Sequence, residues 1–449
     1  MKKIFFALLV LSSQGFAKSS FLDSVERMKW GDLEVVWARD DKFPRFTASF
    51  YFQDGALSDS FPGITQATFD QLTSGTNKQN EKELAEFFDF YGANLKHSVT
   101  HEYSVFSVQA QTKDIAPVVG KVCELFKDAQ YPEKELKSYV SRAKSHLKNL
   151  VTSHSSLADR VFRQVSLQET PYLQPVEGSL AAFDKLTPAL LKERLSKLSK
   201  TKKVLYLAGP SSATDIKDVL KKNCSWENQS AVNKLTLKKP TDQTFIYLVP
   251  VPAANQAQIR IGRYVTAEEV KGKNDNFSFL AGFLGGGFTS KLVQELRVKR
   301  GLTYSAGAYV SMQRDYGRAG VMTFSKNETA AETISIIRDI FQDISQGKID
   351  EKEFKHQQGH QIGGYAFGFE ETTAFLGQIM LYDHQQRDLQ ELARYPESIA
   401  KITPHELSQT DLEAFPWSRL SIVVVGDKSL EKSLSRIRPV KILNYQDYL

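Results

Sequence analysis

The amino-acid sequence repeats itself once along most of its 449 residues. The first copy has a stretch of alternating polarity at Phe106–Ala110, followed by a helix with one apolar face. The second copy has a similar stretch at Tyr316–Phe324 and a similar helix after it. Both helices run into matching text, Glu-Lys-Glu-Leu-Lys at Glu133–Lys137 and Glu-Lys-Glu-Phe-Lys at Glu351–Lys355. Ordered matches at an offset of about 215 residues predict two homologous halves.

Each half also ends with an apolar strand that stops at a glycine, Val204–Gly209 in the first half and Ile422–Gly426 in the second. Strands come in groups and helices are long, unlike the strict alternation of a doubly wound parallel sheet. In the first half, helices are predicted over about 63–74, 80–91 and 114–129. The predicted fold class is therefore α+β, with two homologous halves that each pack helices on one face of a largely antiparallel sheet.

The N-terminus resembles a secretory signal. Lys2 and Lys3 precede the apolar stretch Ile4–Leu11, which is too short to span a bilayer. Small residues at Gly15 and Ala17 predict cleavage after Ala17 and a periplasmic or secreted protein, with an uncleaved anchor as the alternative. No transmembrane segment is predicted in the mature chain. The predicted organisation is a signal peptide, an N-terminal domain, a linker and a C-terminal domain, at residues 1–17, 18–228, 229–239 and 240–449.

Charge and cysteine content narrow the function. The 58 basic and 52 acidic residues are scattered, so charge does not favour nucleic-acid binding. The only two cysteines, Cys123 and Cys224, allow neither a disulfide framework nor a cysteine-based zinc site. One disulfide between them is possible in an oxidising compartment. The position of Cys123 on an apolar helical stripe favours instead a small buried hydrophobic residue.

The most specific stretch of the sequence begins Phe-Leu-Gly-Gly-Gly at Phe283 and ends at Ser305. Its glycines, including Gly285 and Gly286, allow close backbone approach or positive φ. Thr289 or Ser290 can cap the helix that follows, and Gly301 suits its C-terminal end. Arg297 lies at the far end of this helix, and Tyr304 lies just beyond it.

Two interpretations of Arg297 and Tyr304 are open from the residues alone. Their side chains can donate hydrogen bonds to a carboxylate, a peptide carbonyl or a developing oxyanion. Alternatively, Arg297 is a surface residue paired with Glu295 or solvent, and Tyr304 packs at the start of a strand. The segment is not a phosphate loop, because no Gly-Lys-Ser/Thr follows the glycines at the required spacing.

This segment resembles the C-terminal-domain signature of the insulinase-like M16 metallopeptidase family, the inverzincins. Further resemblance lies at Pro171–Gly178 and Gly63–Thr76, so the similarity covers essentially the whole mature chain. The family is built from duplicated α+β halves, of the LuxS/metallohydrolase-like class, which agrees with the repeat found independently.

The resemblance also implies that the catalytic zinc site has been lost. The family motif is His-x-x-Glu-His on the first long helix, where both His bind zinc and the Glu activates water. Gly63 and Gly75–Thr76 set the register, which places Gln66, Phe69 and Asp70 at the three chemical positions. The downstream helix that supplies the third ligand carries Ser145 and His146 and no Glu. We therefore expect no catalytic residue, no metal and no cofactor in this chain, with zinc in a partner subunit.

Four other histidines were considered as a replacement site. His356 and His360 have the spacing of two zinc ligands on one helix, but no general base or third ligand is evident. His97 and His101 are predicted to share a strand face about 13 Å apart, too far to chelate one ion.

In the family, an Arg and a Tyr seven residues later contact the substrate peptide, and Arg297 and Tyr304 match that spacing. Some members divide the work between a zinc-bearing subunit and an Arg/Tyr-bearing one. The resemblance therefore implies a non-catalytic, substrate-binding subunit of a heterodimeric zinc peptidase, inactive alone, with Arg297, Tyr304, Gly285 and Gly286 as substrate-binding residues and a His-x-x-Glu-His subunit as partner. The alternatives are an inactive scaffold, chaperone or binding protein, and a self-sufficient metalloenzyme that uses His356 and His360.

Overall fold

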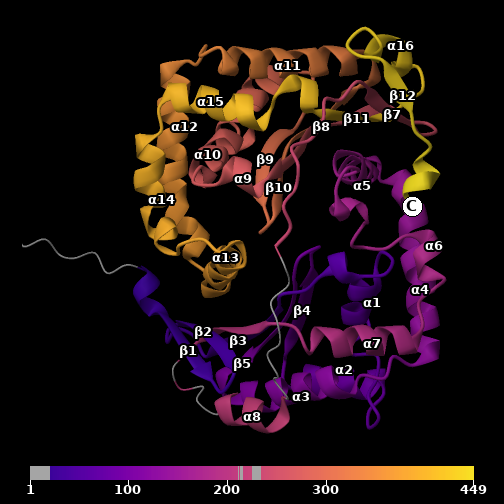
Figure 1. Cartoon of the computed structure of the whole chain (residues 1–449), viewed down its shortest axis with the longest axis vertical. Coiled ribbons are helices and arrows are strands. Elements are labelled where there is room, and N and C mark those ends of the chain that lie inside the picture. The colour runs from indigo at the N-terminus through magenta and orange to yellow at the C-terminus, as the bar shows by residue number, and fades with distance from the viewer. Residues whose placement is uncertain (1–20, 211, 213–215, 225–233) are drawn as a thin grey trace, which may run out of the picture.

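The computed structural model describes residues 21–210, 212, 216–224 and 234–449. They form two six-stranded sheets with the strand orders β1-β2-β6-β3-β5-β4 and β12-β7-β11-β8-β10-β9 (Figure 1). The strands of the first sheet are β1 Val25–Trp30, β2 Leu33–Arg39, β3 Arg45–Phe52, β4 Asn94–Val99, β5 Ser104–Gln111 and β6 Lys203–Gly209. Those of the second are β7 Ile246–Pro250, β8 Gln256–Thr266, β9 Ala306–Met312, β10 Tyr316–Lys326, β11 Ser421–Gly426 and β12 Val440–Ile442. The predicted signal peptide and residues 229–233 of the predicted linker lie outside the described residues.

The two sheets correspond strand by strand. In each, the strand that closes the half, β6 or β11, pairs parallel with one neighbour and antiparallel with the other. The sheets differ at one edge, where β1 runs antiparallel to β2 and β12 runs parallel to β7. The predicted α+β class with two similar halves and largely antiparallel sheets is confirmed.

Helices of each half cover the outer face of its own sheet. In the N-terminal half these include α1 Ile64–Asp70, α2 Glu81–Phe90, α3 Ile115–Asp128, α4 Glu133–Asn149, α7 Pro188–Leu198 and α8 Ile216–Asn223. In the C-terminal half they include α10 Asn274–Gly285, α11 Ala330–Ser345, α12 Glu351–Gly364, α14 Gln390–Lys401 and α15 Pro404–Ala414. The first helix ends earlier than predicted, at Asp70, because Leu72 and Ser74 donate to carbonyls three residues back and turn the chain.

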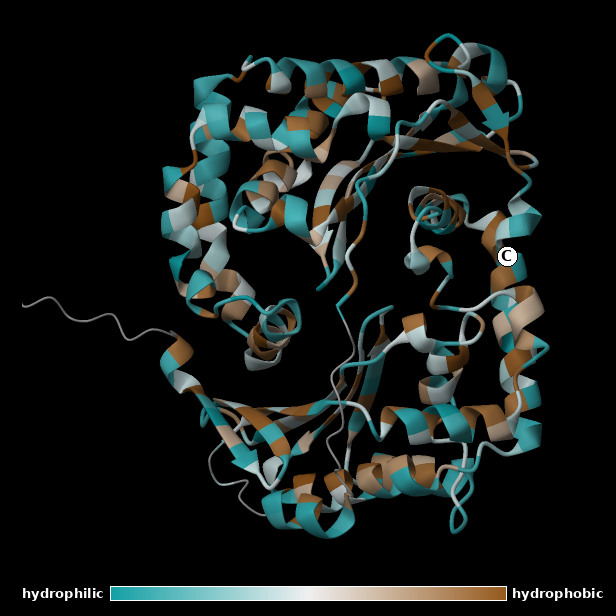
Figure 2. Cartoon of the chain, viewed as in Figure 1, coloured by the Kyte–Doolittle hydropathy of each residue, from teal (hydrophilic) through white to brown (hydrophobic). Residues whose placement is uncertain are grey.

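The inner face of each sheet is covered by a helix from the other half. Helix α5, His154–Ser166, packs on the C-terminal sheet, and α13, Thr372–Gln385, packs on the N-terminal sheet (Figure 1). The strands reflect this, since alternate side chains of β6 and β11 enter two different apolar clusters and none faces water. The brown, apolar colouring in the region of β11 agrees (Figure 1 and Figure 2). The expectation of helices on one sheet face was therefore incomplete, because a helix of each half packs on the inner face of the other half's sheet.

A buried hydrogen-bond network around Glu102 also joins the halves. Glu102 of the N-terminal half lies 2.8 Å from Nε2 of His384 on α13, and accepts from the backbone N–H groups of Arg314 and Asp315 at 2.7 and 3.1 Å. The Tyr172 hydroxyl donates to it at 2.9 Å. The Glu102 and His384 side chains are 1% and 0% exposed. A fully hydrogen-bonded carboxylate thus holds the C-terminal half on the N-terminal half.

Cys123 and Cys224 form a disulfide with a Cα–Cα distance of 5.0 Å. The apolar stripe on α3 is as predicted, and Cys123 is buried in it. The interpretation of Cys123 as an unpaired hydrophobic residue was wrong, because α8 packs on α3 and brings Cys224 against it. Among the described residues, no helix is both long and apolar enough to cross a bilayer.

Candidate functional site

The three residues at the family's zinc positions lie on the short helix α1, facing β4 and α4. Phe69 is 3% exposed and stacks on Phe106 and the ring of His97. The Asp70 carboxylate accepts from Gln66 at 3.0 Å and lies 2.9 Å from His97 Nε2. Side chains that could have faced a metal are thus either packed in the core or hydrogen-bonded to one another.

Helix α4 completes this cluster through a residue that the sequence analysis did not consider. The Tyr139 hydroxyl donates to Asp70 Oδ2 at 2.8 Å. Burial and the nearby Asp70 charge raise the pKa of Tyr139, so the phenol keeps its proton. Ser145 and His146, where the third ligand was sought, are exposed. We name Gln66, Asp70, His97 and Tyr139 the polar cluster.

The polar cluster does not fit a catalytic zinc ion. Zinc is normally held by at least three His, Cys, Asp or Glu side chains, and here only Asp70 and His97 are of that kind. In the part of the chain that the structure describes, no group of three or more such side chains is close enough to hold a metal. Phe69 has no proton-accepting atom to activate water.

Two other histidines differ from the expected arrangement, in which His97 and His101 share one strand face. His101 lies beyond the end of β4, not within it, and contacts Tyr316 and the carbonyl of Gln174. His97 points instead into the polar cluster. His356 and His360 are both exposed on α12.

The glycine segment packs α10 tightly against the edge strand β9. A Cβ at Gly285 would lie 2.0 Å from the backbone nitrogen of Ala308, so only glycine allows this approach. Gly286 is exposed just after the helix. Gly301 ends the next helix with φ of 64° and donates its N–H to the Arg297 carbonyl, as predicted for a C-terminal stop. The contact at Gly285 is a packing requirement that does not depend on a substrate.

The helix after the glycines is short and mostly π-helical, at Val293–Val298. Its last turn presents Arg297 to solvent. Glu295, a possible partner of Arg297 in the alternative interpretation, is held by Lys299 and Arg300 at 2.6 and 2.5 Å. Burial works against its charge, but these hydrogen bonds lower the pKa of Glu295. Within the described residues, Arg297 has no ion pair, and its guanidinium lies 5.1 Å from the ring of Phe288.

Tyr304 is also presented to solvent, with 78% of its surface exposed. It does not pack at the strand start, as the alternative interpretation expected. Phe288 and Val298 are 61% and 51% exposed in the same segment. Phe288 was not predicted as a site residue, although an aromatic residue directly after three glycines was a visible signal. Arg297, Tyr304 and Phe288 are thus three exposed side chains of one segment, a cation and two aromatic rings, and we name them together the arginine–tyrosine surface.

The chain is similar to peptidase M16 proteins in sequence and in fold. Residues 198–359 match the family described as the peptidase M16 inactive domain. An uncharacterized zinc protease of Streptomyces coelicolor is 24% identical over 405 residues, which cover 84% of each chain. The non-peptidase homolog YmxG of Helicobacter pylori is 18% identical over 449 residues, covering 96% of this chain and 100% of that one.

Solved structures share the fold over both halves. The M16 inactive domain structure from Pseudomonas fluorescens has a TM-score of 0.78 at 17% identity, covering 90% of this chain and 98% of that chain. A protease structure from Helicobacter pylori has a TM-score of 0.76 at 15% identity, covering 90% and 99%.

Proposed function

We infer, for this M16-like chain, the role of a non-catalytic, substrate-holding subunit in a heterodimeric zinc peptidase that cleaves peptides in the periplasm. The observation that carries the proposal is the contrast between the halves. The N-terminal half has replaced zinc ligands by the self-satisfied polar cluster, whereas the C-terminal half keeps Arg297 and Tyr304 exposed on the arginine–tyrosine surface. The partner would supply the zinc and the general base.

Both side chains suit a peptide substrate. An extended peptide presents carbonyl oxygens that accept hydrogen bonds, and the guanidinium of Arg297 and the hydroxyl of Tyr304 are donors. Glu295 is occupied by two other cations, so it does not neutralise Arg297. The periplasmic location is supported by the signal-like N-terminus and by the disulfide, which persists in oxidising compartments.

The experiment is reconstitution with a His-x-x-Glu-His subunit recovered by pull-down from the native periplasm. Arg297→Ala and Tyr304→Phe should each lower peptide cleavage by the pair about tenfold or more, with zinc content unchanged. Arg338→Ala is the matched control, since Arg338 is partly exposed, with 40% of its side chain accessible, but pairs with Asp339 on α11. Full activity in both site variants would contradict the proposal.

A second candidate is an M16-like scaffold or binding protein without peptidase partner. It is favoured by the full-length similarity to a protein named a non-peptidase homolog. Isolation of this chain as a stable homodimer that captures no peptidase would support it over the heterodimer.

A further inference from the structure

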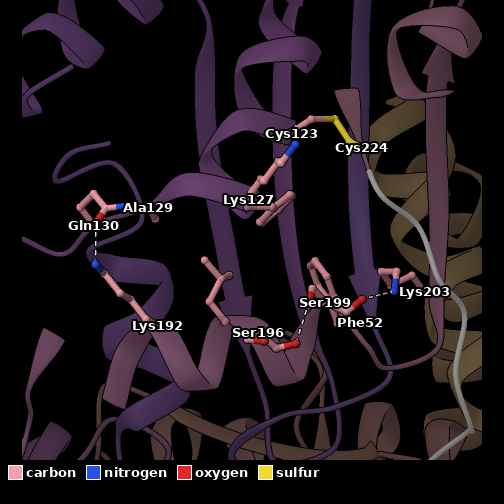
Figure 3. A pocket seen from close by; sticks show the side chains of 12 residues that line it. Phe52, Cys123, Lys127, Ala129, Gln130, Lys192, Ser196, Ser199, Lys203 and Cys224 are labelled. Carbon is pink, nitrogen blue, oxygen red and sulfur yellow. Dashed lines mark hydrogen bonds between the residues drawn. A yellow bond between two sulfur atoms is a disulfide. The ribbon is translucent and has the colours of Figure 1, made fainter. Parts of the chain in front are cut away.

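A cavity of about 320 Å³ lies in the N-terminal half, where α3 and α7 meet the end of α8 (Figure 3). Its walls come from segments far apart in the sequence. The lining residues are Phe52, Cys123, Phe126, Lys127, Ala129, Gln130, Lys192, Leu195, Ser196, Ser199, Lys203 and Cys224. A volume above about 300 Å³ is in the range of small-molecule sites. None of the residues of the polar cluster or of the arginine–tyrosine surface lines it.

The charge of this cavity has one sign. Three lysines, Lys127, Lys192 and Lys203, line it, and no Asp or Glu is among the described residues that do so. Lys203 is only 2% exposed and donates to the carbonyls of Ser199 and Thr201 at 2.6 and 3.0 Å, so its ammonium is already held within the protein. Lys127 and Lys192 are exposed, and their charges favour an anion in the cavity.

The remaining lining is largely apolar. Phe52, Phe126 and Leu195 supply hydrocarbon surface, and the Cys123–Cys224 disulfide forms part of the wall (Figure 3). A bare inorganic anion would leave this surface without a partner. A ligand with both a negative group and a hydrocarbon body would use the ammonium groups and the apolar wall together.

We propose that this cavity binds small carboxylates with a hydrocarbon chain, with the carboxylate at the exposed lysines Lys127 and Lys192 and the chain against Phe52, Phe126 and the disulfide. The site is independent of the proposed peptidase role. Lys127 has no hydrogen bond or ion pair to any described residue, so its ammonium is available to the ligand. Lys192 donates to the amide oxygen of Gln130 at 2.5 Å, an uncharged partner that leaves the ammonium charge unneutralised.

The test is calorimetric titration of the full chain with octanoate, octanol and acetate. Octanoate should bind saturably, and affinity should rise up to about fourfold for each methylene added between acetate and octanoate. No saturable binding of octanoate would overturn the proposal. Equal affinity for octanol would also overturn it, because the lysines would then be irrelevant. Equal affinity for acetate would overturn the role of the apolar wall.

Charge-reversal variants show whether binding occurs in this cavity. Lys127→Glu and Lys192→Glu should each raise the octanoate Kd about threefold or more, and the double variant about tenfold. Lys197→Glu is the matched control, because Lys197 lies on α7 like Lys192 but pairs with Glu193 outside the cavity. All three positions are exposed, so far-ultraviolet circular dichroism should confirm that each variant folds. An unchanged Kd in the double variant would place any binding elsewhere and refute the proposal.

Discussion

Glu102→Gln is expected to lower the free energy of unfolding by about 3 kcal/mol, the cost of leaving one or two buried hydrogen-bond donors without an acceptor. Glu102 and His384 lie 2.8 Å apart, and neither side chain is more than 1% exposed. The amide that replaces the carboxylate keeps the shape but loses one acceptor oxygen. One or two of the donors from His384, Tyr172 and the backbone of Arg314 and Asp315 would then be buried without an acceptor.

The assay is urea unfolding followed by both circular dichroism and tryptophan fluorescence. Each half has its own core, and Glu102 joins the two halves. In the variant, the unfolding curves followed by circular dichroism and by fluorescence should therefore no longer coincide. Glu86→Gln is the control: Glu86 is 64% exposed, pairs with Lys82 at 3.6 Å and should cost less than about 0.5 kcal/mol. A loss below about 1 kcal/mol for Glu102→Gln would refute the reasoning.

Three further predictions concern the two cores and the interface. Replacing Cys123 and Cys224 by Ala should cost about 2–4 kcal/mol in urea unfolding, because the disulfide closes a separation of 101 residues; an unchanged midpoint would contradict this. Gly285→Ala should lower the free energy of unfolding by about 1–3 kcal/mol, because the added Cβ forces β9 away. Gly359→Ala on α12 is the control, since its Cβ meets open space and the change should be neutral or stabilising. Equal thermal midpoints for the two variants would contradict this. Burial lowers the pKa of His101, so the folded protein keeps the ring neutral while the unfolded chain takes up a proton. The free energy of unfolding should therefore be full above about pH 6.5 and fall below it. His101→Gln should flatten that fall, as measured by thermal midpoints from pH 7.5 to 5.5.

Local patterns were sufficient for much of the fold. The helix predicted over about 80–91 is observed as α2, with a capping box at Asn80 and Glu83 and a stop at Gly92, whose φ is 58°. The apolar stripe of α3 is buried as its period indicates. Each of these features depends on residues within one or two turns of the chain, and so can be deduced without knowing what packs against them.

The candidate site was only partly predictable for the same reason. Gly63 and Gly75–Thr76 set the register that identified Gln66, Phe69 and Asp70. That register did not predict that Tyr139 would reach Asp70 from another helix. Likewise, Glu295 was the nearest acid to Arg297 in sequence, yet it bonds to other cations. Which partner a side chain takes depends on distances across elements, and spacing along one helix does not report them.

The internal repeat, read from the sequence alone, determined that the chain would form two α+β halves, since each copy carries the same buried faces. Only the tertiary structure decided how they join. The strands β6 and β11 are apolar on both faces, which shows that something covers each face but not what. The answer, α5 on one sheet and α13 on the other, requires contacts between residues far apart in the chain, and no local period encodes them.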